Sequence, residues 1–379
     1  MTVDRILPTD EAYDLLALTT ELADRELAPR AAQFEERGEF PREVLRTLGR
    51  SGLLGLPYPA EYGGAEQPYE VYLQVLEVLA SRWLAVAEAV SVHTLSCYPV
   101  SAYGDEKLRA MLPDMIGGEL LGAYCLSEPQ GGSDAAALAT RAERDGEEYV
   151  VSGTKAWITH AGAADFYNIF CRTGGPGPKG ISCLLADADT PGITPQAPER
   201  TMGLRASPVA QIAFDDARVP ADRLVGSEGT GFTIAMTALD SGRLGIAACA
   251  VGLAQAALDY AVAYAKERQQ FGQAIIDFQG LGFLLADMAT AVSAARAVTL
   301  AAARLRDAGR PYSVEAAKAK VFATDTAMRV TTDAVQVLGG AGYVADHPVE
   351  RYLREAKVLQ IVEGTNQIQR MVIARSLAR

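Results

Sequence analysis

Glu363 is the residue whose neighbours best suit it for acid–base chemistry. It follows the apolar pair Ile361-Val362 and precedes the polar run Gly364-Thr365-Asn366-Gln367. A carboxylate among apolar neighbours is poorly hydrated, which raises its pKa and makes it a stronger base. The alternative is a solvent-facing glutamate at a helix end, because glycine commonly terminates helices.

Two further segments carry groups that could hold a ligand. The stretch from Tyr124 to Asp134 contains Glu-Pro and Gly-Gly-Ser-Asp, which favour turns. Its paired glycines would also let the backbone approach a large ligand, with Ser127 and Ser133 as hydroxyl donors. The strand-like Trp157-Ile158-Thr159 places a large aromatic face beside a hydroxyl, although a core tryptophan is equally compatible with it.

Several familiar motifs fail on their context. Gly340–Ala345 fits G-x-G-x-x-A, but a helical run precedes it where the dinucleotide fingerprint needs a strand. Ser152–Lys155 fits S-x-x-K, but we expect it on a hairpin turn and not at a helix start. His93, His160 and His347 are far apart in the sequence and form no metal-ligand pattern, so no metal site is expected.

Helices and strands must position these residues. From Thr9 to about Leu120, apolar residues recur at helical spacing; Pro41 begins one helix and Ser51-Gly52 ends it. Tyr58–Gly64 has the composition of a loop. From about Leu121 to about Leu224 the period changes to two. The expected strands are 148–151 and 155–158, forming a hairpin around Ser152-Gly153-Thr154, and 166–172, 180–186 and 209–214.

From about Gly229 the helical pattern returns and continues to the end of the chain. Four long segments with short connections, near 231–268, 279–308, 312–338 and 348–376, predict an antiparallel bundle. The sequence therefore predicts a mostly α protein with a central β domain. The expected domains are an N-terminal helical domain (1–120), a middle β domain (121–228) and a C-terminal four-helix bundle (229–379).

Composition narrows the partners and the location. A chain of 379 residues, 49% of them hydrophobic, can build two or three packed units. The net charge of −12 argues against nucleic acid and anionic membranes as main partners. The alanine-rich runs 84–90 and 246–261 contain polar or charged residues, so no membrane insertion is expected. Five scattered cysteines and no leader-like N-terminus in Met1–Arg5 indicate reduced thiols and a cytoplasmic protein.

Taken together, the segments around Ser127, Trp157 and Glu363 resemble the acyl-CoA dehydrogenase family in order and spacing. The pattern is closest to short-chain and short branched-chain members, and the resemblance covers essentially the whole chain. Several independent motifs in the right order make it specific. The further matching stretches are Met202–Ser207, Leu239–Arg243, Arg268–Gly272, Phe278-Gln279, Gln336–Gly340 and Tyr352–Lys357.

The resemblance implies a fold, a cofactor and partners. It implies homotetramers, or homodimers, of subunits with a β-barrel-like middle domain between two helical domains. FAD would be the cofactor, an acyl-CoA the substrate and an electron-transfer flavoprotein the electron acceptor. Glu363 would be the catalytic base, with Ser127 and Thr159 near flavin N5.

The resemblance also assigns binding residues by motif match. The implied substrate-binding residues are Ser133, Asp240, Arg243 and Gly364. The implied cofactor-binding residues within one subunit are Tyr124, Leu126, Ser127, Gly132, Ser133, Trp157, Ile158, Thr159, Thr365 and Gln367. Those implied to reach the FAD of a neighbouring subunit are Arg268, Gln270, Phe271, Phe278, Gln279, Gln336, Gly339 and Gly340.

The reaction implied is α,β-dehydrogenation of a short, branched or medium-chain acyl-CoA to the trans-2-enoyl-CoA. Glu363 would take the α-proton, the β-hydride would pass to the flavin, and the backbone N–H of Glu363 would help to hold the thioester oxygen. A carboxylate of ordinary pKa, about 4.3, is too weak a base for this proton, so the site must desolvate it. Some relatives place the glutamate just before the arginine that matches Arg243; Gly242 stands there, leaving Glu363 as the only candidate.

Two positions depart from the common family pattern, and alternatives remain. Val362 replaces a tyrosine and His160 an asparagine. Between Leu84 and Tyr103 no strongly basic residue occurs, which disfavours a decarboxylating enzyme for dicarboxylic acyl-CoA. The alternatives are a dehydrogenase of the same fold acting on carrier-protein-bound or unusual thioesters, and a non-catalytic scaffold. The chain is short for an acyl-CoA oxidase, which typically has extra domains.

Overall fold

The computed structural model describes residues 3–378; Met1, Thr2 and Arg379, at the ends of the predicted terminal domains, lie outside the described residues. The N-terminal part is helical, as expected, and α1 continues into the π-helical turn η1. Its helices are α1 Asp10–Leu22, η1 Ala23–Leu27, α2 Ala31–Arg37, α3 Arg42–Arg50, α4 Tyr69–Arg82, α5 Leu84–Tyr103, α6 Glu106–Arg109 and α7 Leu112–Ile116.

Local sequence signals explain where these helices begin and end. The side chain of Thr9 caps α1 by accepting a hydrogen bond from the N–H of Ala12 at 3.2 Å. Helix α3 begins directly after Pro41 and ends at Arg50, which confirms the predicted helix. The 58–64 segment is a loop apart from the short turn Ala60–Tyr62.

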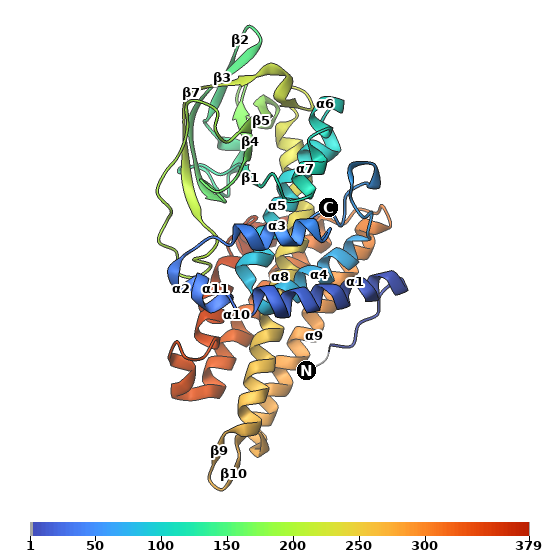
Figure 1. Ribbon diagram of the computed structural model, residues 1–379, viewed down its shortest axis with the longest axis vertical. Coiled ribbons are helices and arrows are strands. Elements are labelled where there is room, and N and C mark those ends of the chain that lie inside the picture. Colours follow the sequence, from blue (N-terminus) through green and yellow to red (C-terminus); the bar gives the residue numbers. More distant parts are fainter. Residues whose placement is uncertain (1–2, 379) are drawn as a thin grey trace.

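The middle part is a β domain, which lies at the top of Figure 1. One sheet has the strand order β6-β7-β3-β2-β4-β5-β8, and β1 pairs in parallel with β4. Predicted strand 166–172 is confirmed as β4. The strands are β1 Gly122–Cys125, β2 Arg141–Asp145, β3 Glu148–Thr159, β4 Phe166–Arg172, β5 Ile181–Asp187, β6 Ile193–Pro195, β7 Val209–Pro220 and β8 Leu224–Val225.

The predicted hairpin around Ser152-Gly153-Thr154 is wrong. Residues 148–159 form one strand, β3, and the turn lies at Gly146-Glu147, between Asp145 and Glu148, which are paired. The register of β3 against β7 shifts between Val151 and Gly153, so the glycine marks an irregularity within a strand. Gly153 has φ +146°, and a β-carbon there would overlap the side chain of Thr140.

The C-terminal part contains the long helices of the predicted bundle, but the fourth segment is not continuous. Residues 348–376 form two helices, α11 and α12, separated by 360–365. The break contains Glu363. The elements are α8 Gly231–Glu267, β9 Gln269–Gln270, β10 Gln273–Ala274, α9 Gln279–Asp307, α10 Ser313–Leu338, the 3-10 turn η7 Gly339–Tyr343, α11 Val349–Leu359 and α12 Asn366–Leu377.

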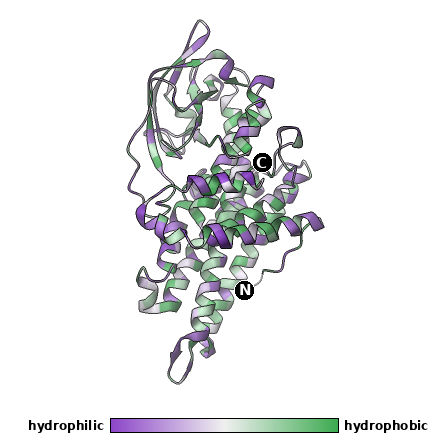
Figure 2. Ribbon diagram, viewed as in Figure 1, coloured by the Kyte–Doolittle hydropathy of each residue, from purple (hydrophilic) through white to green (hydrophobic). Residues whose placement is uncertain are grey.

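Helix α8 is the centre of the helical core. It runs along most of the length of the molecule, from the β domain to the β9–β10 hairpin at the bottom of Figure 1. Helices α4, α5, α9 and α10 all contact it, and the helices around it are the most hydrophobic part of Figure 2. Segments 244–254 of α8 and 84–90 of α5 are almost completely buried. The N-terminal and C-terminal helices therefore share one core.

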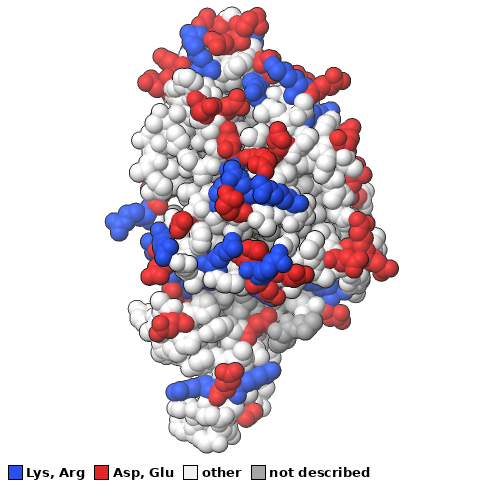
Figure 3. All heavy atoms as spheres, in the orientation of Figure 1, with Lys and Arg blue, Asp and Glu red and all other residues white. Residues whose placement is uncertain are grey.

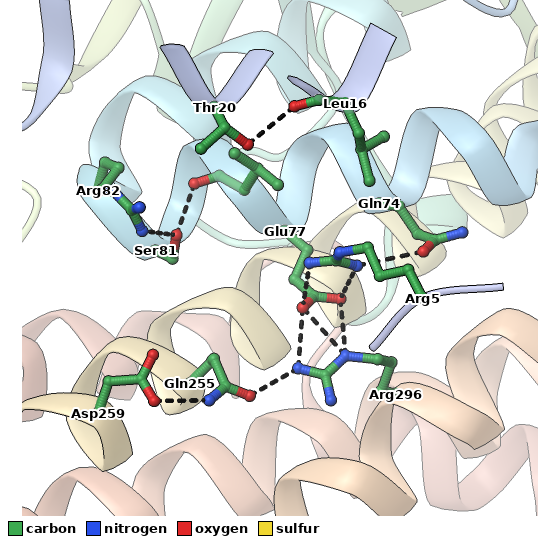
Figure 4. A network of polar contacts seen from close by, with 11 residues as sticks. Arg5, Leu16, Thr20, Gln74, Glu77, Ser81, Arg82, Gln255, Asp259 and Arg296 are labelled. Atoms are coloured by element: carbon green, nitrogen blue, oxygen red, sulfur yellow. Dashed lines mark hydrogen bonds and ion pairs between the residues drawn. The ribbon is translucent and has the colours of Figure 1, made fainter. Parts of the chain in front are cut away.

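A buried polar network joins four parts of this core (Figure 4). Glu77 of α4 accepts hydrogen bonds from Arg5 and, at 2.9 Å, from Arg296 of α9. Arg296 also donates to Gln255 of α8 at 2.8 Å. Because the Glu77 carboxylate is only 5% exposed, its pairing with two guanidinium groups compensates for lost hydration.

The surface and the cysteines agree with an acidic, thiol-containing protein. All five cysteines are free and buried, and acidic and basic side chains are interspersed over the face in Figure 3. Two helices, α8 and α9, are long and apolar enough to cross a membrane by length and composition alone. The most apolar window of α8 is 72% buried in the protein, as befits a core helix, whereas that of α9 is 28% buried.

Candidate active site

The break between α11 and α12 places Glu363 against the middle of α8. Glu363 has φ +52° and Gly364 φ +86°, so two successive residues leave the helical conformation. Thr365 then restarts the helix by accepting a hydrogen bond from the N–H of Ile368 at 3.3 Å. The sequence Glu-Gly-Thr thus encodes both the helix end and the cap of the next helix.

Buried side chains hold this break in one conformation. Lys320 of α10, fully buried, donates to the carbonyl oxygen of Gly364 at 3.1 Å and to Oδ1 of Asn366 at 2.9 Å. Gln369 donates to the carbonyl oxygens of Glu363 and Gly364. Burial lowers the pKa of Lys320 to about 7. These contacts fix the backbone that carries the Glu363 side chain.

The Glu363 carboxylate is buried and lacks hydrogen-bond partners. Within residues 3–378 neither carboxylate oxygen makes a hydrogen bond. Burial raises the pKa of Glu363 to about 8; Glu88 adds to the rise, while Lys320 and Arg243 oppose it. A β-carbon at Gly242 would overlap Oε2 of Glu363, so the glycine lets the carboxylate lie directly against α8.

A second buried carboxylate, Glu88 of α5, faces the same region. It is 4% exposed and accepts hydrogen bonds from Ser207 at 2.9 Å and from Thr159 at 3.3 Å. Burial raises the pKa of Glu88 to about 7, and the two hydroxyl donors oppose that rise. Glu88 thus connects the predicted flavin contact Thr159 with the electrostatic surroundings of Glu363.

Two of the predicted substrate-binding residues pair with each other on α8. Arg243 donates to Oδ1 of Asp240 at 2.5 Å, and Ser313 of α10 donates to the same oxygen at 2.8 Å. Burial raises the pKa of Asp240, against the effect of Arg243. Gly242, beside Arg243, lies against Glu363. Asp240, Arg243 and Gly364 therefore surround Glu363, whereas Ser133 is exposed in the β domain.

A buried ion pair holds the predicted cofactor segment from Tyr124 to Ser133 in place. Lys155 of β3 donates to Oε1 of Glu128 at 2.8 Å, and to the carbonyl oxygen of Leu126 at 3.0 Å; both charged side chains are almost fully buried. Glu128 also accepts hydrogen bonds from the backbone N–H groups of Ala139 and Thr140. Leu126 is buried, whereas Gly132 and Ser133 are exposed.

Trp157 is on the surface and is not a core residue. Trp157 is 63% exposed. Its backbone has a φ of +61°, at a point where the register of β3 against β7 shifts between Lys155 and Ile158. Ile158 is buried, while Thr159 reaches Glu88. The N–H of Ala156 donates to the carbonyl oxygen of Ser127 at 2.9 Å, so this strand and the serine segment are adjacent.

The remaining predicted cofactor residues lie elsewhere on the chain. Phe271 is 94% exposed and stacks edge-on with Phe278 at a ring-centroid distance of 6.0 Å. These residues flank the β9–β10 hairpin, at the end of the molecule opposite the β domain (Figure 1). The exposed residues of this region are Arg268, Gln270, Phe271 and Gln279, and those at the α10–η7 junction are Gln336, Gly339 and Gly340.

The described residues fit a flat, partly polar cofactor in two separate places. Trp157 presents an exposed ring on the strand adjacent to the serine segment, and that segment has exposed backbone at Gly132, where a β-carbon would meet nothing within 4 Å. Phe271 and Arg268 present an aromatic ring and a guanidinium that has no ion pair within residues 3–378. One chain does not bring both sets together, because the Trp157 end of β3 contacts α5 through Thr159, whereas Phe271 is in the β9–β10 turn at the far end of α8 (Figure 1).

Sequence reasoning did not assign a role to Glu88, Lys320 or Ser207. A signal for Lys320 was available, because it interrupts the run of buried alanines Ala316, Ala317, Ala319 and Ala323 on one face of α10. Glu88 similarly stands within an apolar run of α5. A charged residue on a buried helical stripe needs a partner, but the partner becomes visible only in the folded structure.

Comparison with known proteins gives one consistent family. Models described as the N-terminal, middle and C-terminal domains of acyl-CoA dehydrogenase match residues 9–119, 123–217 and 229–378. A protein named acyl-CoA dehydrogenase from Bacillus subtilis is 43% identical over 97% of this chain and 98% of its own.

A short-chain specific acyl-CoA dehydrogenase from Clostridium acetobutylicum is 41% identical over 96% of each chain. Among solved structures, butyryl-CoA dehydrogenase from Megasphaera elsdenii superposes with a TM-score of 0.96 at 39% identity over 100% of both chains. The fold expected from the sequence is confirmed by these matches.

Proposed function

The chain belongs to the acyl-CoA dehydrogenase family, and we propose that it dehydrogenates a short, branched or medium-chain acyl-CoA, with Glu363 as the base that removes the α-proton. The observation that carries this proposal is the Glu363 carboxylate itself. It is buried, it has no hydrogen-bond partner within residues 3–378, and burial raises its pKa to about 8. A base of raised pKa suits a weakly acidic carbon acid.

The backbone of the break supports the same role. Glu363 donates no backbone hydrogen bond within residues 3–378, so its N–H is free to donate to a thioester oxygen. Negative charge develops on that oxygen as the α-proton leaves, and a preoriented donor stabilises it. The positive φ of Glu363 and the contact of Lys320 with Gly364 hold this N–H in place.

The base also has the protonation behaviour that the reaction needs. Only the ionised carboxylate can accept the α-proton, so the rate of proton removal should rise as the pH rises through about 8. The arginine and lysine near Glu363 favour its ionised form, whereas Glu88 disfavours it. Gly242 keeps α8 from displacing the carboxylate.

Members of this family are FAD flavoproteins, and FAD supplies the acceptor for the hydride from the β-carbon when it is bound. We assign Trp157, Thr159 and Ser127 to its ring system. Arg268 suits the pyrophosphate because a guanidinium offers paired donors, and it would come from a second copy of the chain. An electron-transfer flavoprotein is the proposed electron acceptor.

The experiment that tests this function uses the purified protein. It should be yellow, and butyryl-CoA should bleach the flavin absorbance under anaerobic conditions and yield crotonyl-CoA. Hydrogen peroxide formed in air at the rate of substrate turnover would instead indicate an oxidase. If no acyl-CoA bleaches the flavin, the proposed reaction is contradicted.

A further inference from the structure

Resting on the function proposed above, we propose that the preferred acyl group ends in a carboxylate, which Arg306 binds. Arg306 lies near the end of α9 and belongs to none of the motifs that suggested the family. Its place in a pocket that Gly242 of α8 also lines emerges only from the packing of α9 against α8.

A pocket of about 200 Å³ lies next to Arg306 and to the part of α8 that Glu363 contacts. Gly242, whose added β-carbon would overlap the Glu363 carboxylate, lines it, and so does Arg306. Its volume corresponds to roughly seven water molecules, which suits the distal part of an acyl group of about five or six carbons. The other lining residues are Pro57, Tyr58, Pro59, Tyr69, Ser91, Thr94, Leu95, Tyr98, Ser101, Ala238 and Ser241.

The guanidinium of Arg306 is held in place with donor capacity to spare. Its Nε donates a hydrogen bond to Oγ of Ser241 at 3.1 Å, and its Cζ lies 3.9 Å from the centre of the Tyr69 ring. Within residues 3–378, the one carboxylate in ion-pair range is that of Asp307, at 3.7 Å from Nη1. Asp307 already accepts the backbone N–H groups of Tyr69 and Glu70 at the start of α4.

Within residues 3–378, Nη1 and Nη2 of Arg306 make no hydrogen bond. Arg306 is also the only cationic side chain among the residues lining the pocket. A carboxylate matches the paired N–H groups of a guanidinium and forms charge-assisted hydrogen bonds with them.

The rest of the lining is largely apolar, with hydroxyl-bearing side chains among it. Ser91, Thr94, Tyr98 and Ser101 all contribute hydroxyl groups from α5. A methyl-terminated chain would take the partly exposed guanidinium of Arg306 out of water without replacing its hydrogen bonds, which is unfavourable. A carboxylate accepts up to four hydrogen bonds and can replace those that the guanidinium loses.

The spacing also fits one substrate molecule. Ser241 and Gly242 are consecutive residues of α8; the first binds Arg306 and the second lies against Glu363. An acyl group with its α-carbon at Glu363 needs only a few further carbons to reach Arg306. This inference revises the sequence interpretation against dicarboxylic acyl groups, which considered basic residues of the 84–103 segment alone.

The test compares adipyl-CoA with hexanoyl-CoA, two thioesters of equal carbon number that differ in a terminal carboxylate. The measured quantity is kcat/KM for anaerobic flavin bleaching of the holoenzyme. We expect adipyl-CoA to be preferred by about tenfold to a hundredfold, the effect of hydrogen bonds to charged groups. Arg306→Gln should abolish this preference, and Arg306→Lys should retain part of it.

Arg304→Gln is the matched control, because Arg304 lies on the same helix but is exposed and pairs with Glu70. It should leave the preference unchanged. Hexanoyl-CoA reacting as well as adipyl-CoA with the wild-type enzyme overturns the inference even if no variant folds. Absence of bleaching by both thioesters and by butyryl-CoA would be a different result, because it contradicts the proposed dehydrogenation itself.

Discussion

The raised pKa of Glu363 comes from its surroundings and not from its residue type. Burial raises the pKa of Glu363, and the negative charge of Glu88 raises it further. Glu88 has hydroxyl partners but no cationic one within residues 3–378. Above about pH 7 it becomes ionised and opposes the ionisation of Glu363.

Glu88→Gln should therefore shift the pH profile of flavin bleaching to lower pH. Glutamine can still bond with Thr159 and Ser207, but it removes the negative charge that raises the pKa of Glu363. The measurement is the bleaching rate by butyryl-CoA between pH 6 and 10, roughly two units on either side of the Glu363 pKa of about 8.

Glu355→Gln provides the control for this shift. Glu355 is also buried, with its pKa raised to about 8 by burial, but it is not among the groups that act on Glu363. A profile that keeps its midpoint in Glu88→Gln, or moves equally in both variants, would show that Glu88 does not tune the base.

At the scale of elements, the site depends on a helix that stops and restarts. Periodicity alone predicts one helix over 348–376, because both halves have helical spacing. The actual break needs Gly364, the cap Thr365 and the contacts of Lys320 from another helix. Gly364 and Thr365 are visible in the local sequence, but the contacts of Lys320 are not. The motif could therefore be recognised from the sequence, whereas its geometry could not.

In the β domain, too, some features could be predicted from the sequence and others could not. Strand β4 was predictable at its full length, since its apolar run is bounded by turn residues. The error at 152–154 arose because Gly153 was interpreted as a turn, while Asp145-Gly146, a dipeptide typical of hairpins, was overlooked. A glycine inside a strand resembles a turn until its close contact with Thr140 and its pairing with Phe214 of β7 are known.

Lys320→Met tests whether α10 positions the break. The variant loses hydrogen bonds to Gly364 and Asn366, each of a kind worth about 1.5–3 kcal/mol. Bleaching should slow by roughly tenfold to a hundredfold. The midpoint of its pH profile should move up, because Lys320 lowers the pKa of Glu363.

Lys318→Met is the comparison on the same helix. Lys318 is exposed and pairs only with Glu315 among the described residues, so its loss should change stability by less than about 0.5 kcal/mol. If Lys320→Met lowers the melting temperature but leaves the rate and the pH midpoint as in Lys318→Met, Lys320 is structural only.

At the scale of the whole molecule, the residues that we assign to FAD form two separate groups on one chain. Trp157 and the serine segment lie at the β domain, and Phe271 lies at the opposite end. Helix α9, apolar but little buried, offers a surface for a second copy. The sequence indicated this division only through family resemblance, since no periodicity or spacing reveals which residues a partner supplies.

Mixed oligomers test this arrangement. Glu363→Gln should lack the base, and a Phe271→Ala, Arg268→Ala double variant should lack the half-site at the β9–β10 end; each should be inactive alone. Co-expression should restore activity, because one interface then combines an intact Glu363 with an intact end from its partner. Co-expressed variants that stay inactive while forming mixed oligomers would place the whole cofactor site within one chain.

The central claim, that Glu363 is the base, is tested most directly by anaerobic bleaching of Glu363→Gln with butyryl-CoA. Glutamine keeps the size of the side chain and lacks a group that accepts the α-proton. Partly exposed Glu315→Gln, on α10, is the control and should bleach at the wild-type rate. We predict that Glu363→Gln keeps its FAD and its yellow colour but is not bleached. Bleaching of Glu363→Gln at the wild-type rate would contradict the account.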